Sequence, residues 1–203
     1  MTPEMLPWVL ARATGMAALI LFSGAMVAGL LVRTRAAIGP LKGSGMVDLH
    51  RLLSLLALLA TAAHGVFLMQ DATIDITPLS LVVPGLVPYR PLWTGIGVVT
   101  AELALLVHLS FRVRKRIGST AWRRLHWLTY AVFAGAVAHG IGSGTDSGTP
   151  WALAIYGGAV GAVAGLTGWR ATTARRKTRA APRPSPSRQN QPMGDTVTSG
   201  EAS

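Results

Sequence analysis

The arrangement of apolar residues constrains this chain more than any other feature, because they come in blocks of about twenty. Half of the 203 residues are hydrophobic and only 13% are charged. The blocks cover about residues 8–32, 48–70, 92–111, 124–142 and 151–169. An α-helix needs about 20 predominantly apolar residues to cross a bilayer core of about 30 Å. The pattern therefore predicts an all-α integral membrane protein, a bundle of five transmembrane helices.

Basic residues are distributed unequally around these blocks, and the inequality predicts an orientation. Of the 19 Lys and Arg residues, 17 fall in the loops and the tail that share one side of the membrane, and only Arg12 and Arg90 fall on the other. That other side carries the acidic residues Glu4, Asp71, Asp75 and Asp146. Since Lys and Arg are enriched in cytoplasmic loops, we expect the N-terminus outside and the C-terminus in the cytoplasm. The predicted location is the plasma membrane, as a multi-pass protein.

Composition changes near residue 170 and divides the chain into two regions. Residues 1–170 are expected to form the transmembrane domain. Residues 171–203 are poor in apolar residues and rich in Pro, Ser and Arg, so we expect a disordered basic cytoplasmic tail. The net charge of +11 does not indicate nucleic-acid binding, because the charges cluster at helix ends and in the tail. Membrane lipid is the partner that this distribution predicts.

Four histidines occupy two of the apolar blocks as two similarly spaced pairs. His50 and His64 are 14 residues apart, and His126 and His139 are 13 apart, so each pair spans roughly 20 Å along a helix. His50 and His126 lie beside basic residues, whereas His64 and His139 lie toward the opposite face. Neutral imidazoles are axial ligands of haem iron. The pattern therefore indicates two haems, His50/His126 near the inner face and His64/His139 near the outer face.

The chain contains no cysteine, which restricts how a haem could be held. Covalent c-type attachment, Fe–S clusters, disulfides and thiolate nucleophiles are all excluded. The predicted cofactor is therefore haem b, in two copies, held without covalent bonds.

The two histidine pairs differ in their helical geometry. A spacing of 14 residues brings His64 to within about 40° of His50, so both can face the same partner helix. A spacing of 13 residues turns His139 about 140° away from His126 on an ideal helix. Either the two haems meet this helix on different flanks, or a distortion near Gly135 and Gly140 brings the rings round.

Arginines are candidates for the anionic propionates of haem, because the guanidinium fork donates two hydrogen bonds to a carboxylate. Arg51, Arg123 and Arg124 are near the inner pair, where topology signalling is the favoured explanation. Arg12 lies within an apolar run on the side that otherwise lacks positive charge. Arg12 is therefore the predicted propionate ligand, at the outer haem.

Two further ionisable residues and a glycine series have more than one interpretation. His108 could replace a ligand of the inner haem, although a polar helix end is favoured. Glu102 lies near the middle of a predicted helix, where a carboxylate is costly, and it is assigned no role. Gly157, Gly161 and Gly165 form a small-xxx-small pattern that favours close packing within the bundle over a dimer interface.

The histidine-bearing segments LHRLLSLLALLATAAHG and WRRLHWLTYAVFAGAVAHG resemble the ferric reductase-like transmembrane domain family. That family includes the membrane cores of NADPH oxidases and the haem subunit of the bacterial periplasmic methionine sulfoxide reductase system. The stretches YRPLW and RVRKRIGSTAWRRLH add to the resemblance, which covers roughly residues 8–169. It implies a haem b electron conduit with His50, His64, His126 and His139 as axial ligands.

The chain departs from the family pattern in two respects. Larger relatives carry a flavin- and nicotinamide-binding domain after the last helix, and six-helix relatives have one more helix. We therefore expect the membrane subunit of an oxidoreductase, supplied with electrons by a separate cytoplasmic flavoprotein reductase or by a quinol. Ferric iron, oxygen or a periplasmic redox partner is the expected acceptor. The alternatives are a non-redox membrane scaffold and a small transporter or proton pathway whose histidines bind no haem.

Overall fold

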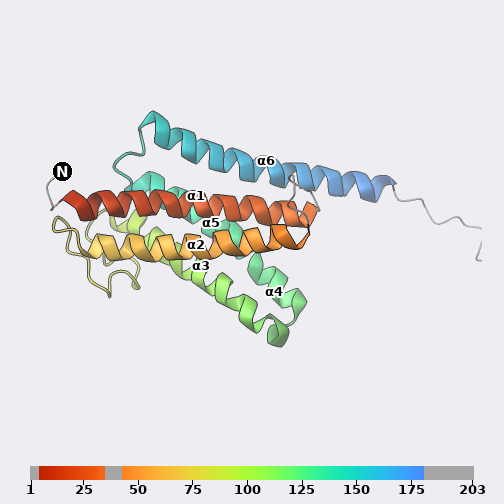
Figure 1. Cartoon of the computed structure of the whole chain (residues 1–203), viewed down its shortest axis with the longest axis horizontal. Helices are drawn as coiled ribbons and strands as arrows, with labels where there is room; N and C mark the ends of the chain where they lie inside the picture. The colour runs from red at the N-terminus through yellow and green to blue at the C-terminus, as the bar shows by residue number, and fades with distance from the viewer. Residues whose placement is uncertain (1–4, 35–42, 181–203) are drawn as a thin grey trace, which may run out of the picture.

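The computed structural model describes residues 5–34 and 43–180, and within these ranges the chain is helical without strands. Figure 1 shows the long helices lying side by side in one elongated bundle. The helices are α1 (Leu6–Thr34), α2 (Ser44–Met69), α3 (Pro91–Ile117), α4 (Ser119–His126), α5 (Leu128–Ser143) and α6 (Pro150–Ala180). The predicted all-α class is confirmed.

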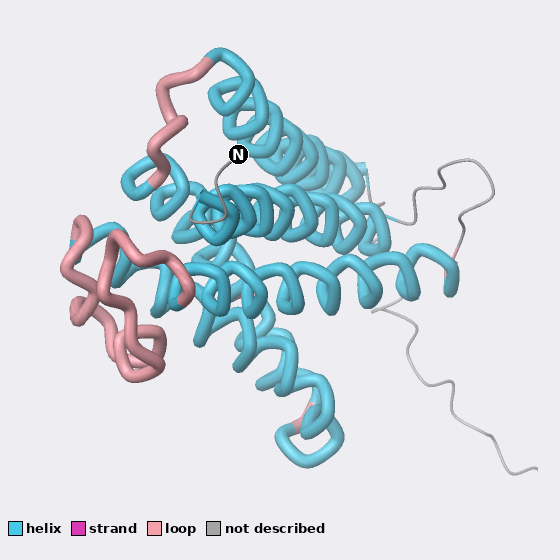
Figure 2. The backbone as a smooth tube through the Cα atoms, turned by 60° about the vertical axis from the view of Figure 1, so that its left-hand side comes forward, coloured by secondary structure: helices cyan, strands magenta, loops and turns pink. Residues whose placement is uncertain are grey.

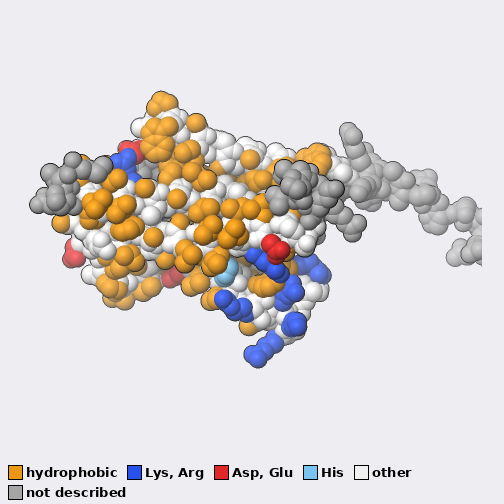
Figure 3. Space-filling view, in the orientation of Figure 1, with side chains coloured by type: hydrophobic (Ala, Val, Ile, Leu, Met, Phe, Trp, Pro, Cys, Tyr) orange, Lys and Arg blue, Asp and Glu red, His pale blue; other side chains and the backbone are white. Residues whose placement is uncertain are grey.

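Four of the helices are long and apolar enough to cross a membrane: α1, α2, α3 and α6. Their apolar segments have 24 to 27 residues, and about 20 are needed for a bilayer core. Apolar side chains also cover much of the face of the bundle seen in Figure 3. Leu52, Leu59 and Leu105 are among the large exposed ones. Apolar surface on this scale is stable in lipid and not in water. The chain is therefore a multi-pass helical membrane protein.

The fourth predicted span, 124–142, is not a single helix. It is divided between α4, of eight residues, and α5, of 16 residues, with the interruption at Trp127. The amide of Trp127 bonds to the carbonyl of Arg124, and the amide of Tyr130 bonds to the carbonyl of Trp127. These i to i+3 bonds form a tighter turn than an α-helix does. Hydropathy is continuous across this turn, which is why the sequence predicted one helix.

The helix α1 organises the bundle, because it packs along α2 and also contacts α5 and α6. The helix α3 packs mainly against α5, and α2 has little contact with α3. Figures 1 and 2 show α1 between α6 and α2. The main buried cluster joins α1, α5 and α6 through Leu19, Leu30, Phe133, Val137, Ala152, Tyr156 and Val163.

The two ends of the bundle differ in charge. At the end where α3 turns into α4, lysine and arginine side chains gather on the surface (Figure 3). We call this the basic end. The opposite end holds the 70–90 loop and the 144–149 connection, with Asp71, Asp75 and Asp146, and we call it the loop end. We call His50 and His126 the basic-end pair, and His64 and His139 the loop-end pair.

The helix α6 differs from expectation in its length and in its glycines. It continues to Ala180, so the first ten residues of the predicted tail 171–203 are helical. The rest of that tail lies outside the described residues, as do Glu4, Arg35 and Lys42. A Cβ added at Gly157, Gly161 or Gly165 would meet no atom within 4 Å. The favoured packing role within the bundle is therefore wrong for these three glycines, because α6 packs through its other face.

Candidate functional site

The structure brings the four predicted histidines together as the two predicted pairs. The ring centres of His50 and His126 are 6.2 Å apart, with an angle of 79° between the ring planes. Those of His64 and His139 are also 6.2 Å apart, with an angle of 78°. The two pairs therefore have the same geometry, although one is built from α2 and α4 and the other from α2 and α5.

This separation fits two imidazoles that share one metal atom from opposite sides. With metal–nitrogen bonds of about 2 Å, the two ring centres would lie about 6 Å apart. No group of three or more His, Cys, Asp or Glu side chains suited to a metal ion occurs in residues 5–34 and 43–180. Each pair thus offers two ligands, the number that a six-coordinate haem takes from the protein.

Hydrogen bonds set the tautomer of three of these rings. Nδ1 of His50 donates to the carbonyl of Ala25 at 2.8 Å, and Nδ1 of His64 donates to the carbonyl of Ala11 at 2.7 Å. Nδ1 of His139 donates to the carbonyl of Trp93 at 2.9 Å. Because a carbonyl only accepts, Nδ1 carries the hydrogen, and Nε2 of the neutral ring keeps its lone pair for a metal. Metal-binding histidines commonly have such a partner for their other ring nitrogen.

A repeat in α1 makes room for the two histidines of α2. A Cβ at Gly15 would lie 3.0 Å from the ring of His64, and one at Gly29 would lie 3.3 Å from the ring of His50. Each glycine is four residues after the alanine whose carbonyl accepts from the same ring. The motif Ala-xxx-Gly thus occurs twice, 14 residues apart, in register with the histidine spacing on α2. The repeat is visible in the sequence, but its role becomes apparent only when α1 lies against α2.

The helix α3 accommodates His139 with the same two features, a carbonyl acceptor and a glycine four residues later. The carbonyl of Trp93 accepts from Nδ1 of His139, and a Cβ at Gly97, four residues later, would collide with that ring. Residues of the stretch YRPLW also form hydrogen bonds with the end of α5. Arg90 donates to the carbonyl of Gly142 at 2.6 Å, and the hydroxyl of Tyr89 donates to that of Ser143 at 3.2 Å. These bonds fix the backbone that follows His139.

The interruption at Trp127 resolves the problem of the 13-residue spacing. His126 is the last residue of α4, and His139 lies in the continuous helix α5. The change of helix between them brings both rings opposite α2. Of the two alternatives, a distortion near Gly135 and Gly140 is not what turns the rings, since both glycines lie inside α5 and the interruption is at Trp127. Instead they allow close approach of neighbours, Thr100 at Gly135 and Tyr156 at Gly140.

A cavity of about 870 Å³ surrounds the basic-end pair. His50 and His126 line it, together with aromatic residues that include Phe111, Trp122 and Trp127. Six arginines also line it: Arg51, Arg112, Arg114, Arg123, Arg124 and Arg170. The cavity thus combines two metal-ligand side chains, flat aromatic walls and positive charge, which suits a flat, apolar and anionic molecule.

Arg12 lies at the loop end, next to the alanine whose carbonyl holds His64. It forms an ion pair with Asp146, which precedes α6, and its guanidinium lies over the ring of Trp8 at 4.1 Å. The pair connects the start of α1 to the connection between α5 and α6. The predicted contact of Arg12 with a propionate stays a prediction.

His108 and Glu102 lie on α3, but in different surroundings. His108 lines the basic-end cavity, yet no ring contact between His108 and another histidine occurs in the described part of the chain. Glu102 is exposed on α3 and does not line the basic-end cavity. A relay that passes from Glu102 to the histidines gains no support from this placement.

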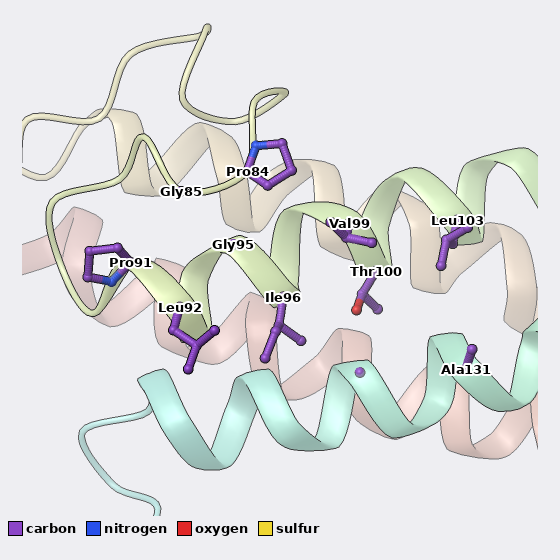
Figure 4. A pocket seen from close by; sticks show the side chains of 11 residues that line it. Pro84, Gly85, Pro91, Leu92, Gly95, Ile96, Val99, Thr100, Leu103 and Ala131 are labelled. Atoms are coloured by element: carbon purple, nitrogen blue, oxygen red, sulfur yellow. The ribbon is translucent and has the colours of Figure 1, made fainter.

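A second cavity, of about 580 Å³, lies between α3, α5 and the loop at Pro84 and Gly85. Figure 4 shows Leu92, Ile96 and Thr100 of α3 directed toward α5 in this cavity. Its lining is apolar apart from Thr100 and contains no histidine. It therefore offers no metal ligand and is separate from both histidine pairs.

The site as a whole consists of two equivalent pairs of opposed imidazoles, stacked along one bundle and separated by the length of α2 between His50 and His64. Comparison of the chain with known protein families, with curated proteins and with solved structures gives no match.

Proposed function

We propose that this protein binds two haems b and transfers single electrons across the plasma membrane, as the membrane subunit of a reductase. The observation that carries the proposal is the duplicated geometry of the histidine pairs, each with ring centres 6.2 Å apart. Two unrelated packing contacts would have no reason to share this separation and nearly the same angle. A common ligand between the rings accounts for both.

The residues of the chain have distinct parts in this function. Nε2 of each paired histidine would bind iron, and the backbone carbonyls of Ala11, Ala25 and Trp93 hold three of the rings in the required tautomer. Gly15, Gly29 and Gly97 provide the clearance that lets the rings lie against α1 and α3. Arg12 would bind a propionate at the loop end. When bound, haem supplies a reversible one-electron couple between ferric and ferrous iron.

The direction of transfer follows from the proposed orientation. Cytoplasmic loops are enriched in Lys and Arg, so the basic end would lie in the cytoplasm and the N-terminus would face outward. The donor would be a separate cytoplasmic flavoprotein reductase or a quinol. The acceptor would be extracytoplasmic, such as ferric iron or a redox partner. This assignment agrees with the resemblance to the ferric reductase-like family.

Absorption spectroscopy tests the proposal directly. We expect the detergent-purified protein, expressed with haem supplied, to give a six-coordinate b-type spectrum when dithionite-reduced. Pyridine haemochrome analysis should give about two haems per chain. Alanine in place of any one of the four paired histidines should remove about one haem. A colourless protein would overturn the proposal and favour the scaffold or the transporter.

Two control variants separate ligation from general damage. Leu59→Ala changes an exposed side chain of α2 between His50 and His64 and should keep both haems. His108→Ala should also keep both, because the ligand pair of the basic-end cavity is His50 and His126. Loss of a haem in His108→Ala, with retention in His126→Ala, would reassign the ligand.

A further inference from the structure

The loop between α2 and α3 contains an apolar segment without charge. Residues 76–88 read ITPLSLVVPGLVP, and the nearest charged residues are Asp75 before them and Arg90 after them. We call these residues the 76–88 segment. With 13 residues it is too short to cross a bilayer. Loops that face water are normally polar, so the composition of this segment calls for a different environment.

The side of the segment that faces away from the bundle is apolar. Leu79 is 60% exposed, Val82 is 59% exposed and Leu86 is 51% exposed, and Val83 is exposed as well. Isolated apolar side chains are common on protein surfaces, but four large ones within eight residues form a patch. Such a patch marks a contact with lipid or with another protein.

The segment lies beside the helices and not beyond their ends. A Cβ at Gly65 of α2 would lie 3.3 Å from the side chain of Leu81, and one at Gly95 of α3 would lie 3.2 Å from the backbone nitrogen of Gly85. Gly65 is four residues before the end of α2, and Gly95 is four residues after the start of α3. Each contact is therefore about 6 Å inside the end of its helix. At this depth the outer side of the segment faces the lipid that surrounds the helices.

The backbone of the segment is suited to surroundings of low polarity. The amides of Val82 and Val83 both donate to the carbonyl of Leu79, at 3.1 and 2.9 Å. The amide of Ser80 donates to the carbonyl of Thr77, and the amide of Thr77 donates to the hydroxyl of Ser80. Three prolines of the segment have no N–H to pair. These features reduce the number of unpaired backbone groups, which are costly near hydrocarbon.

Exposed tryptophans indicate where the membrane boundary lies at this end. Trp93, near the start of α3, is 38% exposed, and Trp151, near the start of α6, is 49% exposed. Tryptophan is enriched at the boundary between hydrocarbon and headgroups. Both residues are within one turn of the loop end of their helices, so the boundary passes close to the 76–88 segment.

We propose that the 76–88 segment is a membrane-inserted loop, with Leu79, Val82, Val83 and Leu86 in the lipid leaflet at the loop end. The partner of this surface is the boundary between acyl chains and headgroups, which continues the lipid-facing surface of α2 and α3. The inference concerns how the chain is anchored and does not depend on haem binding.

Site-directed spin labelling tests the proposal, and the natural chain is suited to it because it has no cysteine. The full chain is labelled with a nitroxide at Leu79→Cys, Val82→Cys or Leu86→Cys and reconstituted into phosphatidylethanolamine and phosphatidylglycerol vesicles. Power saturation then compares collisions with oxygen, which concentrates among acyl chains, and with a water-soluble nickel chelate.

Two matched positions calibrate the measurement. Leu59→Cys, at an exposed side chain of α2, should report lipid, and Thr145→Cys, in the exposed connection before α6, should report water. We expect the oxygen-to-nickel ratio at the three loop positions to exceed that at Thr145→Cys severalfold and to approach that at Leu59→Cys. A ratio equal to that at Thr145→Cys would overturn the proposal and leave this surface for a protein partner.

Photolabelling of the natural chain provides a test that needs no substitution. An apolar diazirine dissolved in the same vesicles should label residues 79–86 as strongly as the exposed leucines of α2, as measured by mass spectrometry of peptides. Absence of label from residues 79–86, with labelling of α2, would contradict insertion. The outcome of either experiment is independent of haem content, so it is separate from the test of the proposed function.

Discussion

The two histidine pairs have the same ring separation but lie in different surroundings. At the loop end, His64 and His139 both lie in long regular helices, both donate to a backbone carbonyl and both face a glycine. At the basic end, His50 also follows this pattern, and His126 ends an eight-residue helix and stacks on Trp122. The basic-end pair also borders the large cavity that six arginines line.

The difference concerns how far the surroundings of each pair can adjust. Backbone carbonyls and glycines of packed helices are rigid, so they hold the loop-end rings in one arrangement. The basic-end pair borders a large cavity and includes the last residue of a short helix, and such surroundings are more adaptable. We infer that the loop-end site is the more rigid one, and that the basic-end site is the one whose affinity and potential the surrounding side chains adjust.

The largest effect is expected when a side chain fills the space that Gly97 leaves beside the ring of His139 at the loop end. Gly97→Leu would drive a side chain into the ring of His139 and should displace it, so that haem content falls from about two to about one per chain. Pyridine haemochrome analysis measures the loss. Gly157→Leu, at a helical glycine with open space around it, is the control and should keep both haems. Retention of both haems in Gly97→Leu would contradict the rigid description of this site.

Haem release should differ between the two sites by a smaller factor. The basic-end cavity has an exposed rim of arginines, so we expect its haem to transfer to apomyoglobin severalfold faster than the loop-end haem. Transfer should be biphasic, and His126→Ala should remove the fast phase. If His139→Ala removed the fast phase instead, the order of rigidity would be reversed.

Charge changes at the loop end should shift one reduction potential by a few tens of millivolts. Arg12→Gln removes a positive charge and should lower the potential of the loop-end haem, because reduction adds an electron. Asp146→Asn removes the negative partner and should raise it. Spectroelectrochemical titration measures both shifts, and the reduction potential of the basic-end haem should hardly change. Shifts of the same sign in the two variants would refute the electrostatic explanation.

The smallest effects are expected at the glycines of α1. An alanine at Gly29 would meet the ring of His50 at 3.3 Å, and one at Gly15 would meet the ring of His64 at 3.0 Å. Alanine is favoured over glycine in a helix by up to about 1 kcal/mol. We expect Gly29→Ala to change stability by less than about 1 kcal/mol and Gly15→Ala to be the less stable of the two. Thermal unfolding in detergent measures this difference, and the reverse order would contradict the tighter packing at the loop end.

Several features of the fold and the site were predictable from the sequence for physical reasons. Apolar blocks of bilayer length determine helices in lipid, so the bounds of α1, α2 and α3 agree with prediction at their apolar segments. The pairing of His50 with His126 and of His64 with His139 followed from matched depth, and the ring contacts confirm it. Binding of haem by these rings stays a prediction.

Other features depend on contacts that the sequence does not express locally. The turn at Trp127 interrupts a continuous apolar block, so hydropathy does not reveal it. The glycines of α6 form a packing motif, yet α6 meets α1 through its other face. The Ala-xxx-Gly repeat of α1 was readable, but its meaning depends on α1 lying antiparallel to α2 with the histidines in register.

Hydropathy and spacing along the chain were sufficient to predict a helical membrane protein, the position of each histidine along its helix and the charge of each end. These are local properties, set by hydropathy and by distance along a helix. The carbonyl and the glycine that meet the rings of His50, His64 and His139 could be identified only from the packed helices, as could the burial of the indole N–H of Trp122 without an acceptor. Those contacts join residues far apart in the chain, and they depend on how the helices pack.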